Sequence, residues 1–144
     1  MLVIRILTLV FCLGIGGKAA IAQHKLPSPV ELYEAVVATG FRNPMVIYKI
    51  AMWESAQLRS KIAREKANLF GLRARSSYLS FRSWRHCLEY MKTLEERRYA
   101  AYPYKEKNDY YDFIAWWGYK TGRSYDPREQ GYIKIIEKVP PPGQ

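Results

Sequence analysis

Residues 53–73 read WESAQLRSKIAREKANLFGLR, and this stretch decides how the chain is interpreted. Glu54 continues the apolar face of a helix that begins at Asn43-Pro44, because Ile47, Ile50 and Ala51 precede it at helical spacing. Fourteen residues after it comes the turn Asn68-Leu69-Phe70-Gly71. Burial among apolar neighbours disfavours the charged form of a carboxyl, so we expect Glu54 to keep its proton near neutral pH. Cleavage of a glycosidic bond requires a general acid of this kind.

Capping residues divide the chain after residue 27 into short helices. Ser28 to Glu31 forms a capping box, with Pro29 at the first helical position. The expected helix starts are Ser28, Asn43, Ser83, Asn108 and Asp126, and a short helical turn is expected over Ser60 to Lys66. The helix that follows Ser83 is predicted to end at Arg97-Arg98, and the next one to end at Gly118.

Apolar spacing predicts which faces of these helices are buried. The first helix is expected to bury Val30, Tyr33, Val36 and Val37, and the last one Tyr132, Ile135, Ile136 and Val139. Between residues 70 and 81 the pattern changes to turn residues and aromatic residues, which favours a small β-hairpin. We therefore predict an α+β, mainly α, single domain.

The first 22 residues have the features of an export signal. One positive charge at Arg5 precedes an apolar stretch at residues 6–16, and Ala20-Ile21-Ala22 matches the small-x-small cleavage rule. We expect cleavage after Ala22, a secreted or periplasmic protein, and one domain over residues 23–144. No later segment is apolar enough to cross a membrane, so we expect no stable membrane insertion after removal of the signal.

Charge and cysteine content restrict the possible partners. Removal of residues 1–22 leaves 21 basic and 13 acidic side chains, a net charge of +8 that suits polyanionic cell-wall polymers. Basic residues gather near the expected site at Arg59, Lys61, Arg64, Arg73 and Arg75. Cys87 remains alone on an apolar helix face and is expected in the core, and two distant histidines do not suggest a metal site. We expect a monomer that needs no cofactor and binds no nucleic acid.

Several of these residues together resemble a known family. Glu54-Ser55, Ser60, Ile62-Ala63 and the run Asn68 to Arg73 are similar to the core of bacterial glucosaminidase domains of glycoside hydrolase family 73. Such domains are peptidoglycan hydrolases with a lysozyme-like fold. The resemblance implies cleavage of the β-1,4 bond after N-acetylglucosamine, with Glu54 as the general acid.

The resemblance also suggests the other site residues. It implies that Tyr119 orients the reacting sugar as a second catalytic residue, and the candidate substrate-binding residues are Asn68, Phe70, Tyr78 and Tyr132.

Two departures from the family pattern stand out. Residues 72–84 contain no aspartate or glutamate, so we expect the 2-acetamido group of the substrate or a water molecule to attack the sugar. Ala56 and Leu58 replace glycines of the family. Glycine lets the chain bend sharply or approach a sugar closely, so these replacements put the family's loop shape beside Glu54 in question.

Two other interpretations are left open by the residues. One is a muramidase or lytic transglycosylase of lysozyme-like fold, which also uses a glutamate in a Glu-Ser setting. Transglycosylases typically continue Gly-Leu-Met-Gln in the turn where this chain has Asn68 to Gly71. The other is a catalytically inactive cell-wall-binding module, which the missing hairpin carboxylate and Leu58 suggest.

Overall fold

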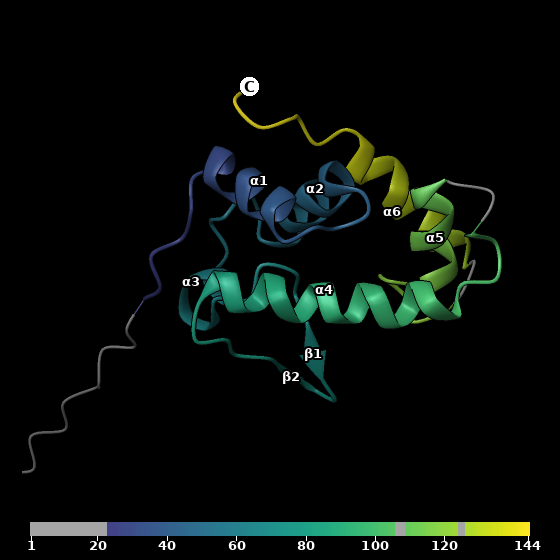
Figure 1. The fold of residues 1–144 in the computed structure, drawn as a ribbon. Helices are drawn as coiled ribbons and strands as arrows, with labels where there is room; N and C mark the ends of the chain where they lie inside the picture. Colours follow the sequence, from purple (N-terminus) through teal and green to yellow (C-terminus); the bar gives the residue numbers. More distant parts are fainter. Residues whose placement is uncertain (1–22, 106–108, 124–125) are drawn as a thin grey trace, which may run out of the picture.

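The computed structural model describes residues 23–105, 109–123 and 126–144. Within these ranges the elements are α1 (Pro29–Ala38), α2 (Pro44–Glu54), α3 (Lys61–Lys66), β1 (Arg73–Ala74), β2 (Ser77–Tyr78), α4 (Trp84–Ala101), α5 (Tyr110–Trp117) and α6 (Pro127–Glu137). In Figure 1 the helix α4 passes below α1 and α2, and the hairpin extends beyond α4. The expected mainly helical, lysozyme-like fold with a small hairpin is confirmed.

The helices begin where side-chain oxygens satisfy their first free N–H groups. Ser28 Oγ accepts from the backbone N–H of Glu31, whose carboxylate accepts from the N–H of Ser28 in return, as the capping box predicts. The side chains of Asn43, Ser83 and Asp126 cap α2, α4 and α6 in the predicted places, and that of Ser60 caps α3. The predicted cap Asn108 lies outside the described residues, and Asp109 caps α5.

Three details of the predicted helices are wrong. Val30 and Val37 are about half exposed, whereas Leu32 is fully buried, because α1 packs on α2 through a face that apolar counting alone does not identify. In α6, Ile135 is 40% exposed and Ile133 is buried in its place. The helix α4 continues past Arg97-Arg98 to Ala101, because nothing in that stretch stops a helix before Pro103.

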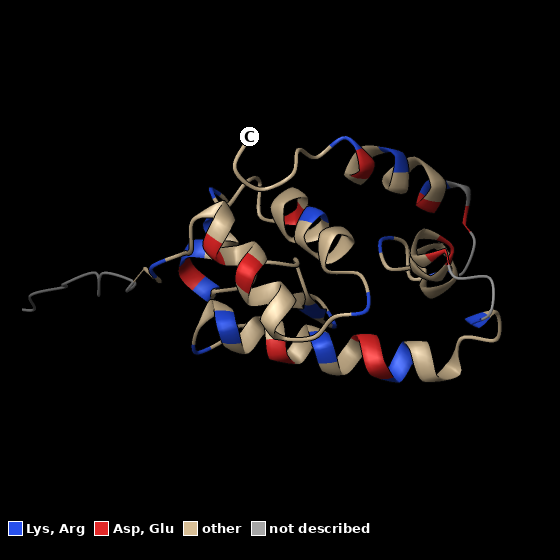
Figure 2. Ribbon diagram, turned by 45° about the horizontal axis from the view of Figure 1, so that its top comes forward, with Lys and Arg blue, Asp and Glu red and all other residues tan. Residues whose placement is uncertain are grey.

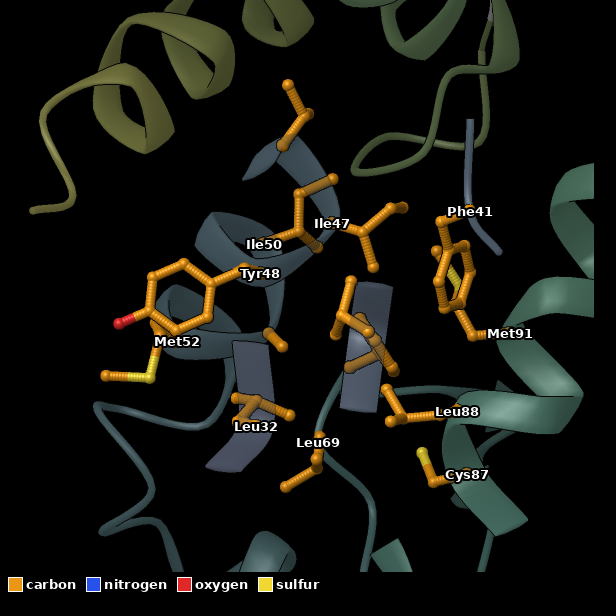
Figure 3. Close-up of a cluster of buried hydrophobic side chains, with 14 of the residues drawn as sticks. Leu32, Phe41, Ile47, Tyr48, Ile50, Met52, Leu69, Cys87, Leu88 and Met91 are labelled. Atoms are coloured by element: carbon orange, nitrogen blue, oxygen red, sulfur yellow. The ribbon is translucent and has the colours of Figure 1, made fainter. Parts of the chain in front are cut away.

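The core lies between the α1–α2 pair and α4. Figure 3 shows Ile47 and Ile50 of α2 on one side, and Leu88 and Met91 of α4 on the other. Cys87 is fully buried here as expected, and burial raises the pKa of its thiol to about 12. A thiol held in this state is a poor nucleophile and behaves as a small apolar side chain.

The same packing brings distant segments to the end of α2. The helix α6 packs on both α2 and α5, so the connection after α5 lies close to Glu54. The hairpin pairs Arg73 with Tyr78 and Ala74 with Ser77 in antiparallel register. Basic and acidic positions alternate along α4, so the positive charge of the chain is not concentrated along this helix (Figure 2). None of the helices in the described ranges is long and apolar enough to cross a bilayer.

Candidate active site

A cleft of about 700 Å³ lies where the end of α2, the hairpin, the second half of α4 and the end of α5 meet. It contains four of the six residues predicted from the sequence: Glu54, Phe70, Tyr78 and Tyr119. Asn68 and Tyr132 lie next to these residues but do not line the cleft. The structure thus brings together residues separated by up to 65 positions in the chain.

Glu54 is the last residue of α2 and extends into the cleft wall. Its side chain is 13% exposed, and the Lys120 ammonium lies 3.2 and 3.3 Å from the two carboxylate oxygens. The apolar row on α2 predicted the burial of this side chain but not a cation as its closest polar partner. Gly71 passes so close that a Cβ atom there would lie 3.3 Å from Glu54 Oε2, and its φ of +62° also favours glycine.

The loop after Glu54 has an unusual backbone. Ala56, Gln57 and Leu58 have φ angles of +50°, +55° and +64°, in the left-handed region that disfavours residues with a Cβ atom. The buried Ser55 stabilises this loop, because its Oγ accepts a hydrogen bond of 2.9 Å from the backbone N–H of Leu58. The positions that carry glycine in the similar family therefore require a glycine-like backbone in this chain too.

Asn68 connects the turn to the hairpin. Its side-chain amide donates to the carbonyls of Leu72 and Leu79 at 2.8 and 2.9 Å, and its oxygen accepts from the N–H of Leu72 at 3.0 Å. The residue is almost fully buried. Its polar atoms are thus used within the fold, where they hold the loop that carries Phe70 and Gly71.

Tyr119 and Tyr132 form a stacked pair beside Glu54, with ring centroids 6.1 Å apart. The Tyr119 hydroxyl donates to the Phe70 carbonyl at 2.8 Å, and burial, followed by the charge of Glu54, raises its pKa well above its usual range. The buried Tyr132 hydroxyl has no partner in strict hydrogen-bond geometry among the described residues, although Glu54 lies close enough to influence it. Burial raises its pKa as well, followed by the influence of Tyr119 and Glu54. Both phenols therefore stay protonated at neutral pH.

The hairpin contributes an arginine and a tyrosine to the cleft. The Arg73 guanidinium lies over the Tyr78 ring at 4.0 Å and donates to its hydroxyl at 2.5 Å. Of the predicted basic group Arg59, Lys61, Arg64, Arg73 and Arg75, Arg73 alone is part of the described cleft lining. The other cations of that lining are Arg98 and Lys120, which sequence reasoning did not identify. Among the described lining residues, Glu54 is the only carboxylic acid.

A second buried glutamate lies behind the tyrosine pair. Glu129 is fully buried, its Oε1 accepts from the N–H of Thr121, and its Oε2 has no partner among the described residues. Its charge contributes to the raised pKa values of Tyr119 and Tyr132, so it lies within their electrostatic reach. Glu129 and Tyr132 are three positions apart on one helix, so their side chains share a face of that helix. This spacing placed Glu129 near the predicted site residue Tyr132, but the sequence-based prediction did not use it.

Comparison with protein families gives one match. The model of the family described as glucosaminidase, mannosyl-glycoprotein endo-beta-N-acetylglucosaminidase, matches residues 31–139, which includes the whole of the cleft lining. No curated protein and no solved structure matches the chain significantly.

Proposed function

Since this chain belongs to the glucosaminidase family, a family of peptidoglycan glycoside hydrolases, we propose that it cleaves the β-1,4 bond after N-acetylglucosamine with Glu54 as the general acid. The observation that carries this proposal is the position of Glu54. Its carboxyl is the one acidic group among the described residues of the cleft wall, in a cleft bordered by aromatic rings. Sugar rings present C–H faces that pack on such rings.

In the proposed mechanism Glu54 protonates the leaving glycosidic oxygen. The carbonyl oxygen of the substrate 2-acetamido group attacks C1 at the same time, and the leaving sugar departs with its new hydroxyl. Water then opens the cyclic intermediate, and Glu54 takes its proton and returns to the acid form. Direct attack by water is the second route, with inversion at C1. The absence of an acidic partner among the described lining residues supports both routes over an enzyme nucleophile.

Tyr119 has a positioning role in this proposal. Its hydroxyl donates to the Phe70 carbonyl, so it fixes the cleft floor beside the acid at the end of the Asn68 turn. The Tyr119 ring lines the cleft, where it packs against the reacting sugar. Phe70 and Tyr78 supply the further apolar faces. No metal or cofactor takes part in these steps.

Wall digestion by the wild type and by Glu54→Gln tests the proposal. We expect the variant to lose at least about 100-fold in rate, the usual contribution of a general acid, while it still folds and binds peptidoglycan. Glu89→Gln is the matched control, because Glu89 lies on α4 with a side chain that is 64% exposed, outside the cleft lining. Full activity of Glu54→Gln would remove Glu54 from the mechanism.

The masses of the products separate the related chemistries. Reducing N-acetylglucosamine ends support the proposal. Reducing N-acetylmuramic acid ends would indicate a muramidase, and anhydro ends a lytic transglycosylase. A sugar ester trapped on a carboxylate would exclude the substrate-assisted and water routes.

The ion pair at the acid favours a second candidate function. Both carboxylate oxygens of Glu54 are engaged by the Lys120 ammonium at 3.2 and 3.3 Å, an arrangement that suits a module that binds the wall without cleaving it. Wild-type protein that binds purified peptidoglycan but releases no fragments over a range of pH values would establish this alternative.

We also propose export of the protein. The support is the charge, apolar stretch and Ala20-Ile21-Ala22 site within residues 1–22. Expression in a bacterial host, followed by N-terminal sequencing of the periplasmic or secreted protein, should give Gln23 as the first residue. An uncleaved, membrane-bound product would contradict this expectation.

A further inference from the structure

The cleft is more basic than the recognition of a neutral sugar requires. Its described lining includes one acidic residue, Glu54, and three basic residues, Arg73, Arg98 and Lys120. Lys120 pairs with Glu54, so these two charges offset each other. The cleft therefore presents the positive charge of Arg73 and Arg98 to whatever binds there.

The two arginines come from different walls of the cleft. Arg98 lies in the last turn of α4, one helical turn after Leu94, which lines the same wall. It is exposed, and its side chain makes no hydrogen bond or ion pair within the described part of the chain. An unpaired guanidinium at the edge of a cleft is free to bind a ligand through its five N–H donors.

Arg73 is held in place by the hairpin. Its guanidinium lies on the Tyr78 ring and uses one donor on the Tyr78 hydroxyl, which leaves its other N–H groups available. The ring limits the motion of the side chain, so less freedom is lost when a ligand binds. One pre-positioned arginine and one unpaired arginine thus border the same space.

Guanidinium groups recognise carboxylates through paired hydrogen bonds of matching geometry. N-acetylglucosamine carries no charge. The lactyl group on alternate sugars of peptidoglycan carries either a peptide stem with free carboxylates or, after removal of the stem, its own carboxylate.

We propose that Arg73 and Arg98 form a carboxylate subsite that makes the cleft selective for anionic glycan strands over neutral N-acetylglucosamine oligomers. The subsite rests on the proposed function, because it specifies which glycan the same cleft accepts. It assigns a role in specificity to two residues that are not needed for proton transfer.

Binding measurements on the Glu54→Gln background test the subsite independently of cleavage. The probes are soluble glycan strands with stems, strands from which an amidase has removed the stems, and N-acetylglucosamine oligomers of equal length. We expect tighter binding of both anionic strands, with a preference that weakens as salt concentration rises. The stronger binder of the two anionic strands identifies whether the stem or lactyl carboxylate is the ligand.

Arginine variants locate the effect. Arg98→Gln and Arg73→Gln should each weaken binding of the anionic strand about tenfold or more, the usual loss of a charge-assisted hydrogen bond, with no change for the neutral oligomer. Arg82→Gln is the matched control, since its side chain is 78% exposed and it does not line the cleft.

The outcomes separate this proposal from the proposed function. Equal affinity for charged and neutral glycans, or equal losses on both in the arginine variants, would overturn the subsite even if the wild type cleaves peptidoglycan. Selective binding without cleavage by the wild type would support the subsite and overturn the hydrolase.

Discussion

The Lys120 ammonium lies 3.2 and 3.3 Å from the two carboxylate oxygens of Glu54, across 66 positions of sequence. The lysine side chain is 48% exposed, and such pairs contribute at most about 1 kcal/mol to stability. The main effect of this contact is therefore on the availability of Glu54, because the lysine engages both carboxylate oxygens that the proposed mechanism directs at the glycan.

Lys120→Met should therefore raise the rate of wall cleavage at neutral pH and change the free energy of unfolding by less than about 1 kcal/mol. Turbidity loss of purified walls and urea unfolding measure the two quantities. Lys61→Met is the control, because Lys61 is 75% exposed and pairs with Glu65 outside the cleft lining. A fall in rate for the Lys120 variant alone would instead give the lysine a direct role in the reaction.

Ala56→Gly should stabilise the protein. Ala56 is exposed and has a φ of +50°, a conformation that costs residues with a Cβ atom about 1 kcal/mol or more and glycine very little. The gain is partly offset by the greater freedom of glycine in the unfolded chain, so we expect up to about 1 kcal/mol from urea unfolding. Ala100→Gly, at an exposed position of α4, should have the opposite sign and cost about 0.5–1 kcal/mol. Equal losses in both variants would show that the loop is not strained.

Glu95 should be the most sensitive buried polar residue. Its fully buried carboxylate accepts from the Tyr110 hydroxyl at 2.6 Å, from the N–H of Arg42 at 3.1 Å and from Lys92 at 2.8 Å. Glu95→Ala leaves the Tyr110 hydroxyl and the Arg42 N–H without their acceptor and Lys92 with Glu96 alone, and we expect a loss of about 3–5 kcal/mol in the free energy of unfolding.

Tyr110→Phe is the milder comparison for Glu95, because it removes one donor and leaves the carboxylate with two others. We expect it to cost about 1–2 kcal/mol. A Glu95→Ala variant as stable as Tyr110→Phe would mean that the three hydrogen bonds contribute little.

Asp126 should make the protein sensitive to acid. Hydrogen bonds from the Arg128 side chain and backbone N–H hold the pKa of the Asp126 carboxyl at about 2, below its ordinary value of 3.8. A pKa lowered by folding means that the ionised group stabilises the protein above about pH 4, and that this contribution is lost as the pH falls towards 2.

Asp126→Asn keeps a residue that can cap α6 but removes the titrating group. Urea midpoints measured from about pH 5 down to about pH 2 should fall less steeply for this variant than for the wild type. Asp112→Asn serves as control, because the exposed Asp112 side chain makes no hydrogen bond or ion pair within the described residues. Parallel curves for the wild type and Asp126→Asn would contradict the prediction.

Local chemistry explains which parts of the fold could be predicted. Ser28, Asn43 and Ser83 act within three residues of their own positions, so the sequence alone identifies the helix starts. The buried face of a helix is not a local property. Val30 was predicted to be buried and is exposed, because the buried face of α1 depends on how this helix packs against α2. The end of α4 lies just before Pro103, a local signal that the basic pair Arg97-Arg98 obscured.

The candidate site also has one part that the local sequence predicts and another that depends on how the helices pack. The helical period put Glu54 on the inner face of α2, and the turn at Asn68 to Gly71 indicated what lies beside it. Lys120 could not be predicted as a neighbour of Glu54, because its approach depends on how α6 packs on both α2 and α5. Contacts of this range are set by the assembled fold rather than by sequence spacing.

The three hydrogen bonds of Asn68 have a consequence for substrate entry. They fix the loop that carries Phe70 and Gly71 to the hairpin before any glycan arrives. The conformational entropy of ordering this wall is therefore lost during folding and does not weaken the binding of each successive sugar strand.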